Sequence, residues 1–68
     1  MYIRHYRELA GMTQSELAQL LRINQRAVSQ WETGETIPRA DKLPQLARIL
    51  GCTINDLFED NEKAASNG

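Results

Sequence analysis

Cysteine and histidine are almost absent from this sequence, which holds one of each, Cys52 and His5. A single cysteine excludes a disulfide within the chain. A structural zinc site built from cysteine and histidine needs four such ligands, so it is excluded as well. The lone thiol fits a reducing compartment. We therefore expect no metal and no covalent cross-link to support the fold.

Long apolar runs are also missing. No segment approaches the ~20 apolar residues that span a bilayer, and the stretch 1–7 lacks the apolar core of a signal peptide. We expect a soluble cytoplasmic protein with no membrane contact. The 68 residues fall below the ~100–200 typical of one domain, which excludes a second independent core.

The residues that usually perform catalysis are scarce. One histidine, one cysteine and no phosphate-binding loop leave no evident nucleophile or acid–base pair, and the chain is too short to form a deep cleft. The sequence therefore predicts no catalytic residue, no cofactor and no enzyme activity.

The net charge is small, at −1, but it is unevenly distributed. Residues 1–51 contain seven basic and five acidic residues, for a net charge of +2, whereas residues 52–68 contain one basic and four acidic residues, for −3. Because the acidity is concentrated near the end, the overall charge does not argue against an anionic partner for residues 1–51.

The sequence pattern predicts helices and no strands. No stretch alternates apolar and polar residues long enough to predict a strand. Glycine, proline and capping residues divide the chain into helices over residues 3–10, 14 to 20 or 21, 25–33, 40–50, and a short one that Thr53 caps and that contains Ile54, Leu57 and Phe58. We predict a compact, all-α, five-helix domain over residues 1–58. Residues 59–68 are polar and aperiodic and are predicted to form an acidic, flexible tail.

Local signals mark the helix ends. Thr13 and Glu16 have the spacing of a capping box, and Asn24 is a favourable N-cap for the third helix. Pro44 lies near the start of the fourth helix and cannot donate a backbone hydrogen bond. We expect a tightened or slightly kinked first turn at that position.

The second and third predicted helices form one unit. Apolar residues at Leu17, Ala18, Leu21, Ile23, Val28 and Trp31 suit two helices that cross at about 90–120° after a short turn. On a helical projection with Gln25 at zero, Ser29, Arg26 and Gln30 follow at about 40°, 100° and 140°. Val28 and Trp31 lie on the far side, so one face is apolar and the other is polar.

The polar face of the third helix suits DNA bases. It carries glutamine, serine, threonine and arginine, in place of the glutamate and lysine usual on a solvated helix face. Arginine can bond bidentately to O6 and N7 of guanine, and glutamine to N6 and N7 of adenine. Arg26 is therefore a candidate for guanine, Gln25 or Gln30 for adenine, and Ser29 for either base.

Three segments together resemble a known family. They read Thr-Gln-Ser-Glu-Leu-Ala-Gln-Leu-Leu over 13–21, Arg-Ile-Asn-Gln-Arg-Ala-Val-Ser-Gln-Trp-Glu-Thr-Gly-Glu-Thr-Ile-Pro over 22–38, and Leu-Pro-Gln-Leu-Ala-Arg-Ile-Leu-Gly over 43–51. As a set they resemble the phage-repressor and Cro type of helix-turn-helix proteins, also called the xenobiotic-response-element type. The resemblance covers about residues 3–58. It implies a lambda-repressor-like fold and a transcriptional regulator, most often a repressor, that binds double-stranded DNA sequence-specifically.

The resemblance also implies roles for individual residues. It places the base-reading residues at Gln25, Arg26, Ser29 and Gln30, and a phosphate-binding residue at Gln14. Further candidates for phosphate contacts are Arg22, Asn24, Thr36, Arg39 and Lys42, although Arg39 and Lys42 also suit plain surface charges. The resemblance pairs Arg7 with Glu32, two residues that otherwise read as surface charges.

Two positions depart from the family pattern. Arg22 stands where the family often has glycine, because the backbone there tends to a positive φ. A non-glycine residue in that conformation costs roughly 1 kcal/mol, which a contact with phosphate would offset. Arg39 stands where a helix-capping serine or threonine is common, so the fourth helix is expected to begin less firmly.

Two functions remain open at this point. The first is a regulator that inserts the third helix into the major groove of a palindromic operator as a homodimer, with recognition helices about 34 Å apart. The alternative is a protein-binding module of the same fold, such as an antitoxin with a toxin as partner. Ile54, Leu57 and Phe58 either form the dimer interface or close the core. The operator and the sign of regulation are not specified by the sequence.

Overall fold

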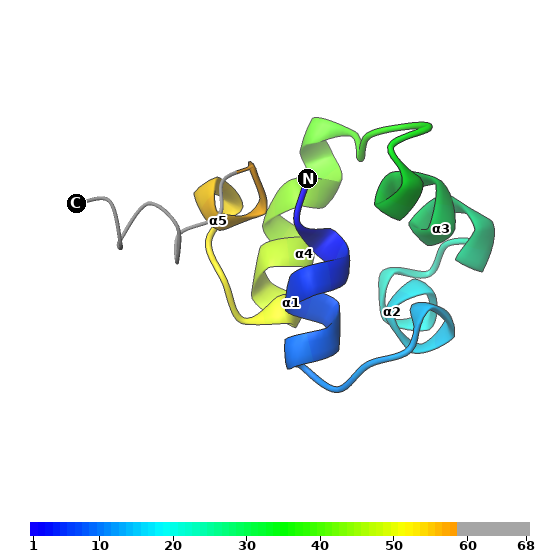
Figure 1. Cartoon of the computed structure of the whole chain (residues 1–68), viewed down its shortest axis with the longest axis horizontal. Coiled ribbons are helices and arrows are strands. Elements are labelled where there is room, and N and C mark those ends of the chain that lie inside the picture. The colour runs from blue at the N-terminus through cyan, green and yellow to red at the C-terminus, as the bar shows by residue number, and fades with distance from the viewer. Residues whose placement is uncertain (59–68) are drawn as a thin grey trace.

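Helices account for all the regular structure in the part of the chain that is described, residues 1–58 of a computed structural model. The elements are α1 (Ile3–Leu9), α2 (Gln14–Leu21), α3 (Gln25–Thr33), the 3₁₀ turn η1 (Ala40–Lys42), α4 (Leu43–Leu50) and α5 (Ile54–Phe58). Figure 1 shows α2 and α3 on one side of the α1–α4 pair and α5 on the other. The all-α, five-helix prediction is confirmed. The predicted tail at 59–68 lies outside the described residues.

The helix starts follow from the capping residues. The Thr13 hydroxyl accepts a hydrogen bond from the Glu16 amide at 3.1 Å, and the Glu16 carboxylate accepts one from the Thr13 amide at 2.9 Å. These bonds lower the pKa of Glu16. The Asn24 side chain accepts from the Arg26 amide at 2.9 Å. Both predicted caps are confirmed, because each satisfies an amide that the first helical turn leaves without a partner.

The start of α4 shows the effect of Pro44. Residues Ala40–Lys42 form a 3₁₀ turn, and α4 follows directly with Pro44 in its first turn. Proline is tolerated there because the amide it lacks would have had no acceptor within the helix. Arg39, which precedes the 3₁₀ turn, makes no side-chain cap. The predicted tightening is confirmed.

All five helices contribute to one core. The fully buried residues Ile3, Leu17, Val28, Leu46 and Leu57 come from α1, α2, α3, α4 and α5 in that order. A backbone hydrogen bond of 2.8 Å from the amide of Tyr2 to the carbonyl of Leu57 joins the N-terminal segment to α5. Because each helix is amphipathic and shorter than three turns, its stability depends on this shared core more than on its own propensity.

Candidate functional site

The α2–α3 pair is joined by a tight turn. The amides of Arg22 and Ile23 donate to the carbonyls of Gln19 and Ala18 at 3.1 and 3.0 Å, which ends α2. Asn24 then has extended dihedral angles (φ −74°, ψ 140°) and caps α3. This arrangement fixes the direction in which α3 leaves the turn.

One face of α3 is buried against the core. Val28 has no exposed surface, and Trp31 is only 9% exposed. They pack in the same core as Leu17, Ala18 and Leu21 of α2. The expected roles of Val28 and Trp31 as anchors are confirmed, and they determine which face of α3 points outward.

The opposite face of α3 carries the predicted base-reading residues. Gln25 and Arg26 are exposed, and Ser29 and Gln30 are half-buried. Within residues 1–58, no hydrogen bond or ion pair engages any of these four side chains. Their donors and acceptors therefore remain available to a binding partner.

The candidate phosphate-binding residues lie at helix starts, in the loop after α3 and, for Arg22, directly after the end of α2. Gln14 is the first residue of α2, and Asn24 immediately precedes α3. Thr36 and Arg39 lie between α3 and η1, and Lys42 ends η1. Arg22, Asn24, Thr36 and Arg39 are exposed, whereas Gln14 and Lys42 are half-buried.

Backbone hydrogen bonds hold the loop after α3 in place. The amides of Glu35 and Thr36 donate to the Gln30 carbonyl at 3.0 and 3.3 Å, which fixes the loop to the end of α3.

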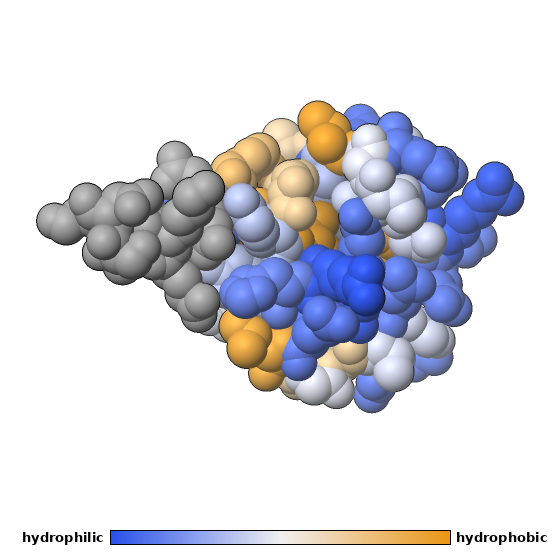
Figure 2. Space-filling view, viewed as in Figure 1, coloured by the Kyte–Doolittle hydropathy of each residue, from blue (hydrophilic) through white to orange (hydrophobic). Residues whose placement is uncertain are grey.

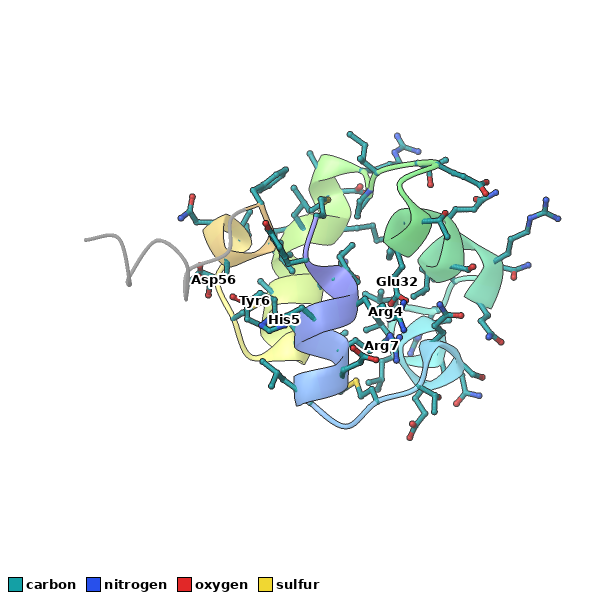
Figure 3. All side chains as sticks on the ribbon, in the orientation of Figure 1. Arg4, His5, Tyr6, Arg7, Glu32 and Asp56 are labelled. Atoms are coloured by element: carbon teal, nitrogen blue, oxygen red, sulfur yellow. The ribbon has the colours of Figure 1, made fainter. Side chains whose placement is uncertain are left out.

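A buried ion pair connects three helices. Arg7 of α1 donates to Glu32 of α3 through Nε at 2.6 Å and through a terminal nitrogen at 3.1 Å. The other terminal nitrogen donates to the carbonyl of Met12 at 2.7 Å, and Gln14 of α2 donates to Glu32 at 2.9 Å. The Arg7 and Glu32 side chains are only 11% and 5% exposed. Figure 3 shows Arg7 directed from α1 toward Glu32.

Part of this network has no signal in the sequence. The resemblance implies a pair between Arg7 and Glu32, but not the contacts of Gln14 and Met12. Gln14 and Glu32 are 18 residues apart, and nothing in the residues near either one indicates the contact. As a result, Glu32 accepts one N–H of the Gln14 side-chain amide and fixes that amide at the start of α2.

The network sets the ionisation of Glu32. Burial by itself raises the pKa of this carboxyl, but hydrogen bonds from Arg7 and Gln14 and the positive charges of Arg7 and Arg4 outweigh it, so the pKa lies below its ordinary 4.5. The hydrogen bond to Glu32 also raises the pKa of Arg7. Both side chains are therefore charged over the whole neutral range.

The lowered pKa predicts a loss of stability in acid. The ionised Glu32 stabilises the fold fully above the ordinary pKa that it has in the unfolded chain, and this contribution decreases as pH falls through the lower folded pKa. We expect the free energy of unfolding, measured with urea from pH 7 to pH 3, to fall less in Glu32→Gln than in the wild type. Glu35→Gln is the control, because Glu35 is exposed and belongs to neither ion pair of the described residues. Equal pH profiles for the wild type and Glu32→Gln would contradict the prediction.

Four cations in the stretch of chain from the end of α2 to the start of α4 have no acidic partner in the described residues. Arg22, Arg26, Arg39 and Lys42 belong to neither of the two ion pairs found there, Arg4–Glu8 and Arg7–Glu32. Glu35 and Asp41 lie in the same stretch and reduce the net positive charge. A basic but mixed surface suits a polyanion that is also recognised by specific contacts.

The described residues lack other kinds of site. They contain no cluster of three or more potential metal ligands. No pocket is found on this part of the chain, and none of its helices is long and apolar enough to span a membrane. The candidate site on this part of the chain is the outward face of α3, where Gln25 and Arg26 are exposed.

Comparison with known proteins gives concordant matches. A family model described as helix-turn-helix matches residues 3–57. The chain is 48% identical over 40 residues to the 26 kDa repressor protein of Escherichia phage HK022, which covers 59% of this chain and 17% of that protein. It is 39% identical over 62 residues to the HTH-type transcriptional regulator DicA of Escherichia coli, covering 90% and 46%.

A third relative is named an activator, whereas the phage protein is named a repressor. The HTH-type transcriptional activator BcrR of Enterococcus faecalis is 31% identical over 52 residues, covering 76% of this chain and 26% of that protein. The chain thus spans less than half the length of each of these relatives. No solved structure matches the chain.

Proposed function

Because the chain belongs to the helix-turn-helix family of phage-repressor and Cro type, we propose that it regulates transcription by binding double-stranded DNA sequence-specifically. The observation that carries this proposal is the outward polar face of α3. Its Gln25 and Arg26 side chains are exposed and make no hydrogen bond in the described part of the chain, while Val28 and Trp31 hold the opposite face in the core. The proposed DNA-binding unit is residues 1–58.

The proposed mode of binding places α3 in the major groove. The groove is about 12 Å wide, which matches a helix about 10–12 Å in diameter with its side chains. Arg26 then recognises guanine, Gln25 or Gln30 recognises adenine, and Ser29 approaches either base closely. The proposed phosphate contacts come from Gln14, Arg22, Asn24, Thr36, Arg39 and Lys42. Because Glu32 accepts one N–H of the Gln14 side-chain amide, that residue would meet a phosphate through its other side-chain N–H or its backbone amide.

The proposed active form is a homodimer on a palindromic operator. Leu57 is fully buried and closes the core, whereas Ile54 and Phe58 are 39% and 54% exposed. Met1 and Tyr2 are also exposed, and the backbone bond between Tyr2 and Leu57 holds this segment beside α5. Figure 2 shows apolar side chains gathered near the N-terminus and α5. Such a face suits a second copy of the chain.

The proposed effect on transcription is repression through occupation of a promoter, and the proposed location of the protein is the cytoplasm. One relative is named a repressor and another an activator, so the sign of regulation needs its own measurement. A reporter gene placed behind the selected operator is expected to lose expression when the protein is supplied. Increased expression would reverse this part of the proposal and leave DNA binding intact.

DNA binding is tested by selection from a random pool of duplexes, followed by mobility shifts over a range of salt. We expect a palindromic consensus whose half-sites are one helical turn apart, about 34 Å centre to centre. The logarithm of the binding constant is expected to fall linearly with the logarithm of salt concentration, by about 0.9 for each phosphate neutralised. Failure to enrich any sequence, or an affinity that does not change with salt, would overturn the proposal.

A further inference from the structure

Four helices of this chain end in the same backbone motif. The first residue past α2, α3 and α4, and the second residue past α1, has a positive φ, and its amide and the next one donate back into the last turn. This is the Schellman motif, in which the left-handed residue is usually glycine because a Cβ is disfavoured there. Glycine occupies it at Gly11, Gly34 and Gly51. Arg22 occupies it after α2.

Arg22 is the exception throughout the described residues. Its dihedral angles are φ 57° and ψ 45°, and no other non-glycine residue there has a positive φ. The motif around it is complete, since its amide donates to Gln19 and that of Ile23 donates to Ala18. The backbone therefore adopts the conformation that favours glycine, although the residue is not glycine.

The side chain of Arg22 does not compensate for this conformation within residues 1–58. It is exposed, and it belongs to neither ion pair of the described structure. No side-chain hydrogen bond of Arg22 is found there either. A residue held in a disfavoured conformation without a local benefit points to a role outside the folded monomer.

The position of Arg22 indicates what that role is. Arg22 lies three residues before Gln25, at the junction where α2 ends and α3 begins. A guanidinium is suited to bidentate contact with phosphate oxygens. We infer that Arg22 binds a phosphate of the DNA backbone beside the entry of α3 into the groove, and that its presence makes the folded protein less stable in exchange for tighter binding. This inference rests on the proposed function.

Three substitutions separate the backbone conformation from the charge. Arg22→Gly removes both the strain and the cation, Arg22→Asn tolerates the conformation without the cation, and Arg22→Lys keeps the cation and the strain. Arg48→Gln is the control for a loss of one positive charge on α4. The measurements are the melting temperature and the salt dependence of binding to the selected operator.

We expect Arg22→Gly to raise the melting temperature by about 4–8 °C. Arg22→Gly and Arg22→Asn are expected to weaken binding about two- to fivefold per protomer and to reduce the salt slope by about 0.9 per protomer. Arg22→Lys and Arg48→Gln are expected to leave that slope unchanged.

The outcomes distinguish this inference from the proposed function. If the wild type binds its operator but Arg22→Gly and Arg22→Asn keep the full salt slope, the inference is wrong and the proposed function stands. A lower melting temperature in Arg22→Gly, with the slope retained, would instead assign Arg22 to stabilising the end of α2. If the wild type selects no DNA, the proposed function itself fails.

Discussion

Replacing Arg26 by alanine is expected to weaken binding to the selected operator by about 1–3 kcal/mol, or roughly 5- to 150-fold. The loss should be confined to sequence-specific binding, because Arg26 faces outward from the first turn of α3 and would contact a base. Variant duplexes with each base pair changed in turn provide the measurement. The preference for guanine is expected to relax at one position of the half-site and to persist at the others.

Lys42→Ala is the matched control for Arg26→Ala. It removes one positive charge at the end of η1, at a site proposed to meet phosphate. We expect it to weaken binding to all duplexes about equally and to lower the salt slope by about 1. Equal weakening of all duplexes by Arg26→Ala as well would mean that Arg26 contacts the DNA backbone. Both variants should unfold within about 0.5 kcal/mol of the wild type, since both replace residues without partners in the described fold.

Replacing Arg7 by methionine is expected to destabilise the folded protein by about 3–5 kcal/mol. The substitution leaves the Glu32 carboxylate buried without its cation and removes the donor that Met12 accepts from. A loss of this size is between about a third and all of the ~3–10 kcal/mol expected for a chain of this length at 0.05–0.15 kcal/mol per residue. Urea unfolding followed by the fluorescence of Trp31, the single tryptophan, gives the measurement.

Arg4→Met provides a control on the same helix. Arg4 pairs with Glu8 at 3.6 Å, but the two side chains are 69% and 58% exposed. Exposed pairs contribute about 0–1 kcal/mol, so we expect Arg4→Met to change the free energy of unfolding by at most that amount. The double variant Arg7→Met with Glu32→Met should be more stable than Arg7→Met alone, because it leaves no unpaired charge. If Arg7→Met cost no more than Arg4→Met, the ion pair would have no structural importance.

The helices from α1 to α4 show how far local sequence signals extend. α4 begins at Leu43, three residues after the predicted start at 40, because Ala40–Lys42 form a 3₁₀ turn. The bounds of α2 and α3 match the predicted ranges, because Thr13 and Asn24 cap their starts and the signals lie within three residues of each end. α1 ends at Leu9, one residue before the predicted limit, and Ala10 is exposed. The outward face of α3 was also predictable, since the spacing of Val28 and Trp31 determines it.

The role of α5 could not be assigned from its sequence. Ile54, Leu57 and Phe58 are all large and apolar, and either closing the core or binding a second copy was consistent with their spacing. In the structure Leu57 is fully buried and the other two are exposed. The difference arises because only Leu57 meets the core supplied by α1 to α4, and five residues of helix do not specify which neighbours they will have.

The sequence by itself determined the helices, their caps and the polar face of α3, because each depends on residues within one or two turns of one another. The tertiary structure alone decided that the Arg7–Glu32 pair is buried and that Glu32 also holds Gln14. These contacts join residues 25 and 18 positions apart. Burial of a charge depends on how the helices pack together, and no local pattern records that packing.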